Sequence, residues 1–244
     1  MKILVCISKT PDTTSKISFI KDGKEFNSEG IQYIMNPYDE WYALVRAVEL
    51  KEKNGGTVTV IHVGDASGEI VVRKALAIGA DDAIRVDVVP QSSYQVASEI
   101  AAHAAGYDII FTGKETIDYN GAEVGAMLAE MLDLPYISFV NKLEAESNNW
   151  VVSREIEGGS ETVKVTGPVV ISAAKGLAEQ RIPNMQGIMM AKRKPLNVVA
   201  ASQTEPGATV SSHELPPAKS GVKMIDPNDM DTLVKLLHEE AKVI

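Results

Sequence analysis

The chain has 244 residues, 45% of them hydrophobic, and a formal net charge of −9 at pH 7. This length can bury a full core, and the acidic balance argues against a nucleic-acid partner. A single cysteine, Cys6, excludes an internal disulfide and a cysteine-built metal site. Cys6 lies in an apolar run, so we expect a buried, unreactive thiol. Neither a signal peptide nor an apolar run of membrane-spanning length is found, which predicts a cytoplasmic protein with no direct membrane insertion.

The first elements of the chain point away from one common nucleotide fold. An apolar strand over residues 2–7 is followed by SKTPDTTSK, which contains no glycine. The corresponding turn of a Rossmann dinucleotide fold is glycine-rich, so phosphates must be held elsewhere. Residues 17–26 predict a small hairpin. After a strand at residues 31–35, Asn36 suits a helix N-cap and Pro37 the first helical position; this helix start could face a ligand or be an ordinary capped helix.

The middle of the chain alternates strands and helices. Buried strands are expected at residues 57–63, 83–86 and 108–112, and helices within residues 64–80 and from Ser92 or Ser93 to residue 105. Near-continuous apolar strands separated by helices are typical of parallel sheets. The sequence therefore predicts an α/β fold with a doubly wound, mostly parallel sheet covered by helices on both faces.

A polar loop after the third of these strands is the candidate ligand site, because open parallel sheets bind ligands at the carboxyl ends of their strands. Gly113 and Gly121 allow a close approach of the backbone, and a helix beginning near Gly121 would favour a phosphate. Asp118 and Asn120 can accept hydrogen bonds from ribose hydroxyls or an adenine amine. Alternatively, these two residues cap the helix and Gly125 only permits tight packing. The loop has no GxGxxG or GxxxxGK[ST] pattern, so both interpretations stay open.

From residue 136 onward, the alternation of strands and helices is replaced by consecutive strands. Strands at residues 136–140, 142–146, 149–155 and 161–166 predict an antiparallel extension with turns at Asn148-Asn149 and Gly158-Gly159, and an apolar strand at residues 168–172 is expected to rejoin the main sheet.

Beyond Ala173 the apolar residues have no steady period, which predicts an exposed functional loop; Lys192-Arg193-Lys194 follows as a basic cluster. Residues 201–225 are polar, and residues 229–243 predict a helix with one apolar stripe. We expect residues 1–200 to form one α/β domain and residues 201–244 a linker and helical arm that clasps a partner subunit.

Three segments together resemble the β subunit of electron transfer flavoprotein. They are NPYDE at residues 36–40, GKETIDYNGAEVG at residues 113–125 and VSREIEGGSETVKVTGPVVIS at residues 152–172. The resemblance implies a heterodimer whose larger α subunit holds most of a redox-active FAD, while this subunit completes the flavin pocket and buries AMP. It implies no acid, base or nucleophile, because the flavin carries the chemistry.

The same resemblance implies individual site residues. The AMP pocket would use Cys6, Asn36, Pro37, Tyr38, Asp39, Val63, Ile117, Asp118, Tyr119, Asn120, Gly121, Ala122, Glu123, Val124, Gly125, Ala126, Met127 and Leu128. Tyr38 and Thr13 would face the flavin. The family often has acidic residues where this chain has Tyr119-Asn120-Gly121, which keeps open a second FAD in place of AMP, with NADH as donor, as in family members that split electron pairs.

The resemblance also implies the electron partners. The heterodimer would accept electrons from flavin dehydrogenases, such as the acyl-CoA dehydrogenases of fatty acid oxidation, and pass them to electron transfer flavoprotein:quinone oxidoreductase. Alignment on residues 188–192 places Met185 at the apolar position of the family's recognition loop, where a flexible thioether suits varied pockets. Two other classes share parts of this pattern. An ATP-binding stress-type protein needs a glycine- and serine-rich loop after the first strand, which SKTPDTTSK is not, and a plain interaction protein would use the loop after residue 112 only as a capped turn.

Overall fold

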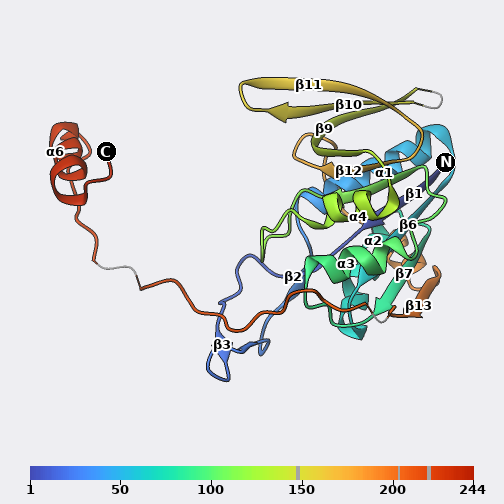
Figure 1. Cartoon of the computed structure of the whole chain (residues 1–244), viewed down its shortest axis with the longest axis horizontal. Helices are drawn as coiled ribbons and strands as arrows, with labels where there is room; N and C mark the ends of the chain where they lie inside the picture. The colour runs from blue at the N-terminus through green and yellow to red at the C-terminus, as the bar shows by residue number, and fades with distance from the viewer. Residues whose placement is uncertain (147–148, 203, 219–220) are drawn as a thin grey trace.

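A nine-stranded sheet forms the body of the molecule (Figure 1). The computed structural model describes residues 1–146, 149–202, 204–218 and 221–244. In sheet order the strands are β11 (Gly159–Thr166), β10 (Asn149–Ile156), β9 (Tyr136–Glu146), β12 (Val169–Ala173), β8 (Ile109–Gly113), β1 (Lys2–Cys6), β6 (Thr57–Val63), β7 (Asp82–Asp87) and β13 (Leu196–Ala200). Neighbours from β9 to β13 pair in parallel, whereas β9, β10 and β11 pair antiparallel. The predicted mostly parallel sheet with an antiparallel extension is confirmed.

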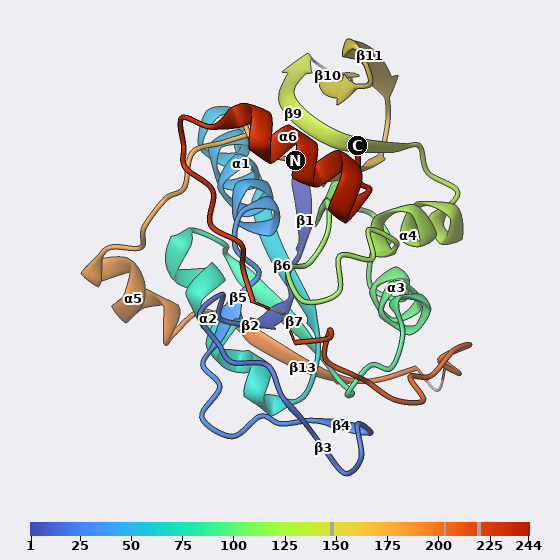
Figure 2. The ribbon, with the colours of Figure 1, turned by 90° about the vertical axis from the view of Figure 1, so that its left-hand side faces the viewer.

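Helices cover both faces of this sheet (Figure 2). On one face, α1 (Asp39–Asn54) and α2 (Glu69–Ile78) pack against inward residues of β1 such as Ile3 and Val5. On the other, α3 (Ser93–Ala101) and α4 (Val124–Leu132) pack against Leu4 and Cys6. Alternate residues of one strand thus enter two separate cores, as the period of two in a strand requires. The doubly wound arrangement is confirmed.

Two short strand pairs lie beside the main sheet. Strands β3 (Phe19–Ile20) and β4 (Glu25–Phe26) form the predicted hairpin. Strand β2 (Lys9–Pro11), within the glycine-free segment after the first strand, pairs antiparallel with β5 (Tyr33–Met35). The first strand is therefore followed by a second short strand instead of a phosphate-binding turn.

The predicted start of α1 was wrong, and the helix predicted to begin near Gly121 is present with its start shifted. The cap position of α1 is Tyr38, with φ of 65°, and no side chain caps it. Asn36 instead points its buried side chain across to the loop after β8. Helix α4 begins at Val124, three residues after Gly121, because Asn120 and Ala122 take left-handed backbone conformations. Of the two candidate caps for α3, Ser92 is the cap, although the helix ends at Ala101.

The antiparallel extension differs from its prediction in detail. The two strands expected over residues 136–146 are one strand, β9, whose register against β10 shifts between Ser153 and Arg154. The hairpin from β10 to β11 reverses at Glu157-Gly158, one residue before the expected pair. Asn148 of the other predicted turn lies outside the described residues.

The segment after β12 is more regular than predicted. It contains the short helix α5 (Met185–Ala191), capped by Asn184, and the edge strand β13, which pairs with β7. The basic cluster is partly structural, because the Lys194 ammonium donates to the carbonyl of Leu76 at 2.9 Å. Met185 nevertheless has 74% of its surface exposed.

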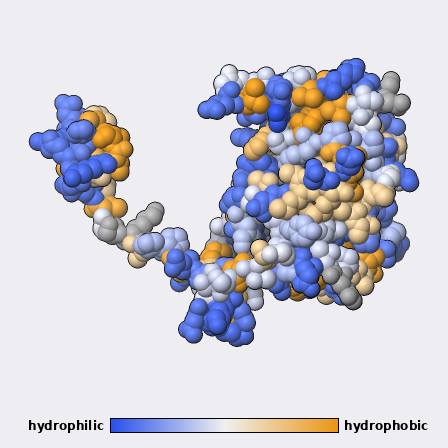
Figure 3. Space-filling view, viewed as in Figure 1, coloured by the Kyte–Doolittle hydropathy of each residue, from blue (hydrophilic) through white to orange (hydrophobic). Residues whose placement is uncertain are grey.

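The C-terminal helix α6 (Met230–Leu236) and the single turn η2 (Leu237–Ala241) that continues it lie apart from the body (Figure 1). None of their residues, all of them described, is buried. The arm's apolar side chains gather on one side of it and its hydrophilic side chains on the other (Figure 3). The predicted amphipathic helix is confirmed, and its role as a clasp stays a prediction. Within the described ranges, no helix combines the length and apolar character needed to cross a membrane.

Candidate functional site

A cavity of about 620 Å³ opens at the carboxyl ends of β1, β6 and β8. Nine of the predicted contact residues line it: Cys6, Val63, Asp118, Tyr119, Gly121, Ala122, Glu123, Val124 and Gly125. Apolar side chains of Ile61, Val96 and Ile100 form part of its wall. Segments that lie far apart in sequence therefore meet where parallel sheets hold their ligands.

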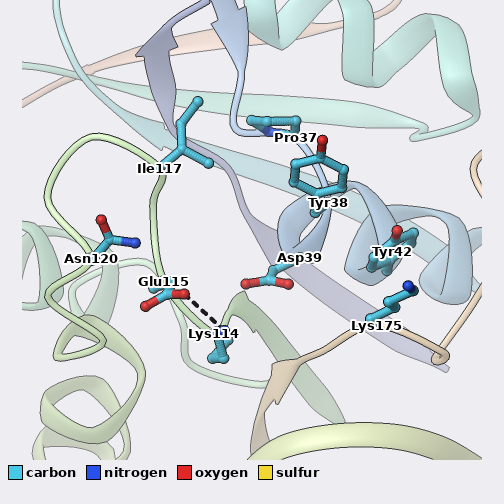
Figure 4. A pocket seen from close by; sticks show the side chains of 9 residues that line it. All are labelled: Pro37, Tyr38, Asp39, Tyr42, Lys114, Glu115, Ile117, Asn120 and Lys175. Atoms are coloured by element: carbon cyan, nitrogen blue, oxygen red, sulfur yellow. Dashed lines mark ion pairs between the residues drawn. The ribbon is translucent and has the colours of Figure 1, made fainter. Parts of the chain in front are cut away.

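A smaller pocket of about 230 Å³ adjoins the start of α1 (Figure 4). Five other predicted residues line it: Pro37, Tyr38, Asp39, Ile117 and Asn120. Tyr42, Lys114, Glu115 and Lys175 complete its wall, and the ammonium of Lys114 pairs with the carboxylate of Glu115 at 2.8 Å. The predicted set is thus divided between two hollows on the same edge of the sheet.

Four predicted residues line neither hollow. The side chain of Asn36 is fully buried and joins the segment before α1 to the loop after β8. Its amide donates to the carbonyl of Glu115, and the N–H of Ile117 donates to its Oδ1, both at 3.0 Å. Leu128 is fully buried in the core, Met127 packs against the same core, and Ala126 is exposed. Asn36 therefore holds the site loop in place, whereas the last turn of the predicted contact segment belongs to the helix and not to the cavity.

The start of α4 leaves backbone donors open. Its cap residue, Glu123, makes no side-chain bond to the first turn. Asp118 does not cap it either, because its carboxylate accepts from the N–H of Tyr119 at 3.0 Å. A Cβ at Gly125 would lie 2.8 Å from Oγ1 of Thr112, so this glycine permits α4 to approach β8 closely. Gly125 thus permits tight packing and also lines the cavity, and the capping interpretation of Asp118 is wrong.

A buried carboxyl group that the sequence did not single out stands in the wall of the larger cavity. Glu40, 4% exposed, accepts from the N–H of Ser8 at 2.6 Å and from its hydroxyl at 2.7 Å. Burial raises the pKa of Glu40 to about 8, against the opposing effect of these hydrogen bonds. The carboxyl group is therefore largely protonated at neutral pH. Burial also raises the pKa of the Cys6 thiol, which accords with an unreactive cysteine.

His62 is a second missed residue. Its Nδ1 lies 3.0 Å from the carbonyl of Ile7, and among the described residues its Nε2 has no hydrogen-bond partner. Room for the ring exists because a Cβ at Gly64 or Gly68 would lie 2.3 or 2.1 Å from Nε2. Burial lowers the pKa of His62, so the ring is neutral and the bond to Ile7 assigns the proton to Nδ1. Nothing in the sequence around this single histidine in an apolar strand predicts that its ring lies in the wall of the larger cavity.

The fold and the cavity together define the class of protein: an α/β protein with its ligand site at the carboxyl ends of a parallel sheet. Residues 25–204 match the family described as "Electron transfer flavoprotein domain". The chain is 36% identical to "Electron transfer flavoprotein subunit beta" of Bacillus subtilis (strain 168), with 100% of each chain covered. It is 32% identical over 248 residues to the Homo sapiens protein of the same name, with 96% of this chain and 97% of that one covered.

A third relative is "Protein FixA" of Azotobacter vinelandii, 35% identical over 210 residues, with 81% of this chain and 74% of the relative covered. The chain belongs to the electron transfer flavoprotein β-subunit family. Its role is in flavin-linked electron transfer, and membership decides against the ATP-binding stress-type alternative.

Proposed function

We propose that the chain is the β subunit of a cytoplasmic, heterodimeric electron transfer flavoprotein, with residues 1–200 as its nucleotide-binding domain and residues 201–244 as the linker and arm. The single observation that carries this proposal beyond family membership is the cavity at the carboxyl edge of the sheet. Its volume lies within the range of about 300–1,000 Å³ that is usual for small-molecule sites.

The residues of this cavity fit AMP. Open backbone amides at the start of α4, where Val124 and Gly125 line the wall, suit the phosphate. Such donors matter here because the lining has more carboxyl groups than ammonium groups. Ile61 and Val96 offer apolar surface to a base. AMP bound there is proposed to be structural, since its phosphate would lie at the start of α4, whereas the redox chemistry belongs to the flavin.

The smaller pocket is the surface proposed to complete the flavin site. Tyr38 is 55% exposed at its rim, and the wall carries two ammonium groups, of Lys114 and Lys175, and two carboxyl groups, of Asp39 and Glu115 (Figure 4). Thr13, the other residue proposed to face the flavin, lies between β2 and β3. When bound between the subunits, FAD supplies the one-electron and two-electron chemistry. The chain's own groups exclude water on one side and place charge near the site, and the α subunit provides the remaining contacts.

The proposed electron donors are flavin dehydrogenases, including acyl-CoA dehydrogenases, and the proposed acceptor is electron transfer flavoprotein:quinone oxidoreductase. Support comes from the exposed apolar side chains of Ile182, Met185 and Met189, which have 83%, 74% and 68% of their surface exposed. Monomeric surfaces rarely leave several such residues together without a partner. Met185 is the proposed recognition residue.

One observation keeps a second function in view: the larger cavity is roomy enough that its volume does not exclude a second FAD in place of AMP. In that alternative the heterodimer splits electron pairs from NADH.

The test is reduction of the purified heterodimer. The chain is co-expressed with its α subunit, and the complex is mixed without oxygen with an acyl-CoA dehydrogenase and its substrate. Bleaching of the flavin absorbance at catalytic dehydrogenase concentration is expected. A complex that accepts electrons from NADH and from no flavin dehydrogenase would favour the electron-splitting alternative.

A further inference from the structure

The chain does not leave the body when it leaves the edge strand β13. Ser202 donates its backbone N–H and its hydroxyl to the two carboxylate oxygens of Glu99, each at 2.8 Å. Glu99 lies on α3 and is fully buried. A buried carboxylate whose two oxygens are both satisfied by one residue fixes that residue firmly. The C-terminal segment therefore starts from an anchored point beside α3.

The residues that follow run along the first turn of α3. The side-chain amide of Gln95 donates to the carbonyl of Thr204 at 3.4 Å, and the hydroxyl of Ser92 donates to the carbonyl of Pro206. Gly207 lies beside the ring of Tyr94, since a Cβ built there would be 3.7 Å from that ring. Ser92 also lines the larger cavity. The segment thus passes along one rim of the cavity.

A second anchor holds the far end of this segment. The ring of His213 stacks on Phe19, with centroids 4.8 Å apart and planes 6° apart. The backbone N–H of His213 donates to the carbonyl of Gly23 at 2.7 Å. Both contacts are made to the β3–β4 hairpin. Figure 1 shows the orange-red segment passing below α3 toward β3 before it departs to α6.

Between the anchors, Val210 contributes to the wall of the larger cavity. It is the only lining residue, within the described chain, that comes from beyond β13. We propose that residues 204–213 form a strap that closes one side of this cavity and sets how fast a bound adenine nucleotide leaves. This inference rests on the proposed function. Because the strap is held at both ends, a ligand that leaves past it must open one anchor, so the strap acts on the dissociation rate.

The test measures nucleotide exchange in the intact heterodimer. Its probe is radiolabelled AMP, and the variant is the double substitution Val210→Ala and His213→Ala, which removes the apolar cover and the stacking anchor while the backbone bond to Gly23 remains. Release is expected to become about fivefold faster or more, because two methyl groups and one ring contact are lost. Val222→Ala is the matched control, since Val222 is 83% exposed in the segment beyond the strap; its rate should equal that of the unaltered complex.

A double variant that retains AMP and releases it at the unaltered rate would overturn the strap and leave the proposed function standing. Absence of AMP from the unaltered complex would instead contradict the proposed function and the strap with it. If the variant does not assemble, hydrogen exchange of the unaltered complex decides the matter. Saturating AMP, compared with the nucleotide-stripped complex, should slow amide exchange in residues 204–213 and leave residues 221–228 unchanged; equal exchange in the two states would overturn the strap.

Discussion

The carboxyl edge of the sheet and the C-terminal arm use similar apolar residues in opposite ways. At the sheet edge, every residue of β12 and most of β8 is buried by helices of the same chain. In the arm, Met230 and Val234 are each 55% exposed, and none of the described arm residues is buried. Burying a large apolar side chain stabilises by about 1.5–3 kcal/mol, so the arm leaves this gain unrealised in the single chain. An amphipathic pattern shows that a face needs covering, but not which chain will cover it.

The largest contrast should come from matched leucines in the two regions. Leu128→Ala is expected to lower the free energy of unfolding by about 2–5 kcal/mol, because the side chain is fully buried in the core. Leu233→Ala in the arm should change the same quantity by less than about 0.5 kcal/mol. Urea unfolding of the chain without its partner, followed by tryptophan fluorescence, measures both. Equal losses would mean that the arm packs on its own chain in solution.

Removing the arm should affect assembly and not the fold. Truncation after Ala218 leaves the contacts of residues 204–213 in place and deletes α6. The dissociation constant of the heterodimer should rise about a hundredfold, because the apolar side chains of Met230 and Val234 no longer contact the α subunit. Sedimentation of the co-expressed complex measures this effect. The control is Lys223→Gln, which removes only an exposed ion pair of 2.7 Å with Glu240 and should be nearly neutral. A truncated chain that assembles at full strength would contradict the assignment of the arm.

The buried carboxyl at the sheet edge predicts a pH dependence that the exposed regions lack. The pKa of Glu40 rises from 4.5 to about 8 on folding, so the folded chain keeps a proton that the unfolded chain releases. Stability contributed by this group is therefore present below pH 4.5, falls as pH rises from about 4.5 to about 8, and levels off above. Thermal unfolding at pH 5 and pH 8 should show a smaller loss for Glu40→Gln than for the unaltered chain.

A matched surface variant makes this pH test specific. Glu130 lies exposed on α4, so Glu130→Gln should keep the full loss of stability between the two pH values. If Glu40→Gln and Glu130→Gln behave alike, the carboxyl of Glu40 is ionised in the folded protein at neutral pH.

The smallest effect on the fold is expected at Met185. Its side chain is 74% exposed on α5, so Met185→Ala should change stability by less than about 0.5 kcal/mol. Electron acceptance from an acyl-CoA dehydrogenase should slow about fivefold if the residue anchors the complex. Ile156→Ala is the control, because Ile156 is 47% exposed on the distant β10–β11 hairpin. A loss of stability without slower transfer would assign Met185 to the core.

The same contrast explains what could be predicted from the sequence. Strand β6 was predicted with its exact bounds, and β1 and β8 to within one residue, because buried strands read as apolar runs. Edge strand β13 is apolar in sequence, but it is short, only partly buried and preceded by a segment without a steady period, so it was not recognised as a strand; the seven residues of α5 are too few to show a helical period.

The candidate site was predictable in position but not in detail. Asn36 has the local signature of a cap, yet its partners Glu115 and Ile117 are 79 and 81 residues away. Glu40 and His62 line the cavity only because separate elements meet there. No local pattern reports such long-range neighbours.

The central claim is that the cavity at the sheet edge holds AMP while FAD binds between the subunits. Denaturing the purified heterodimer and identifying the released nucleotides by chromatography and mass spectrometry tests it most directly. The account predicts one FAD and one AMP per heterodimer. Two FAD and no AMP per heterodimer would contradict it.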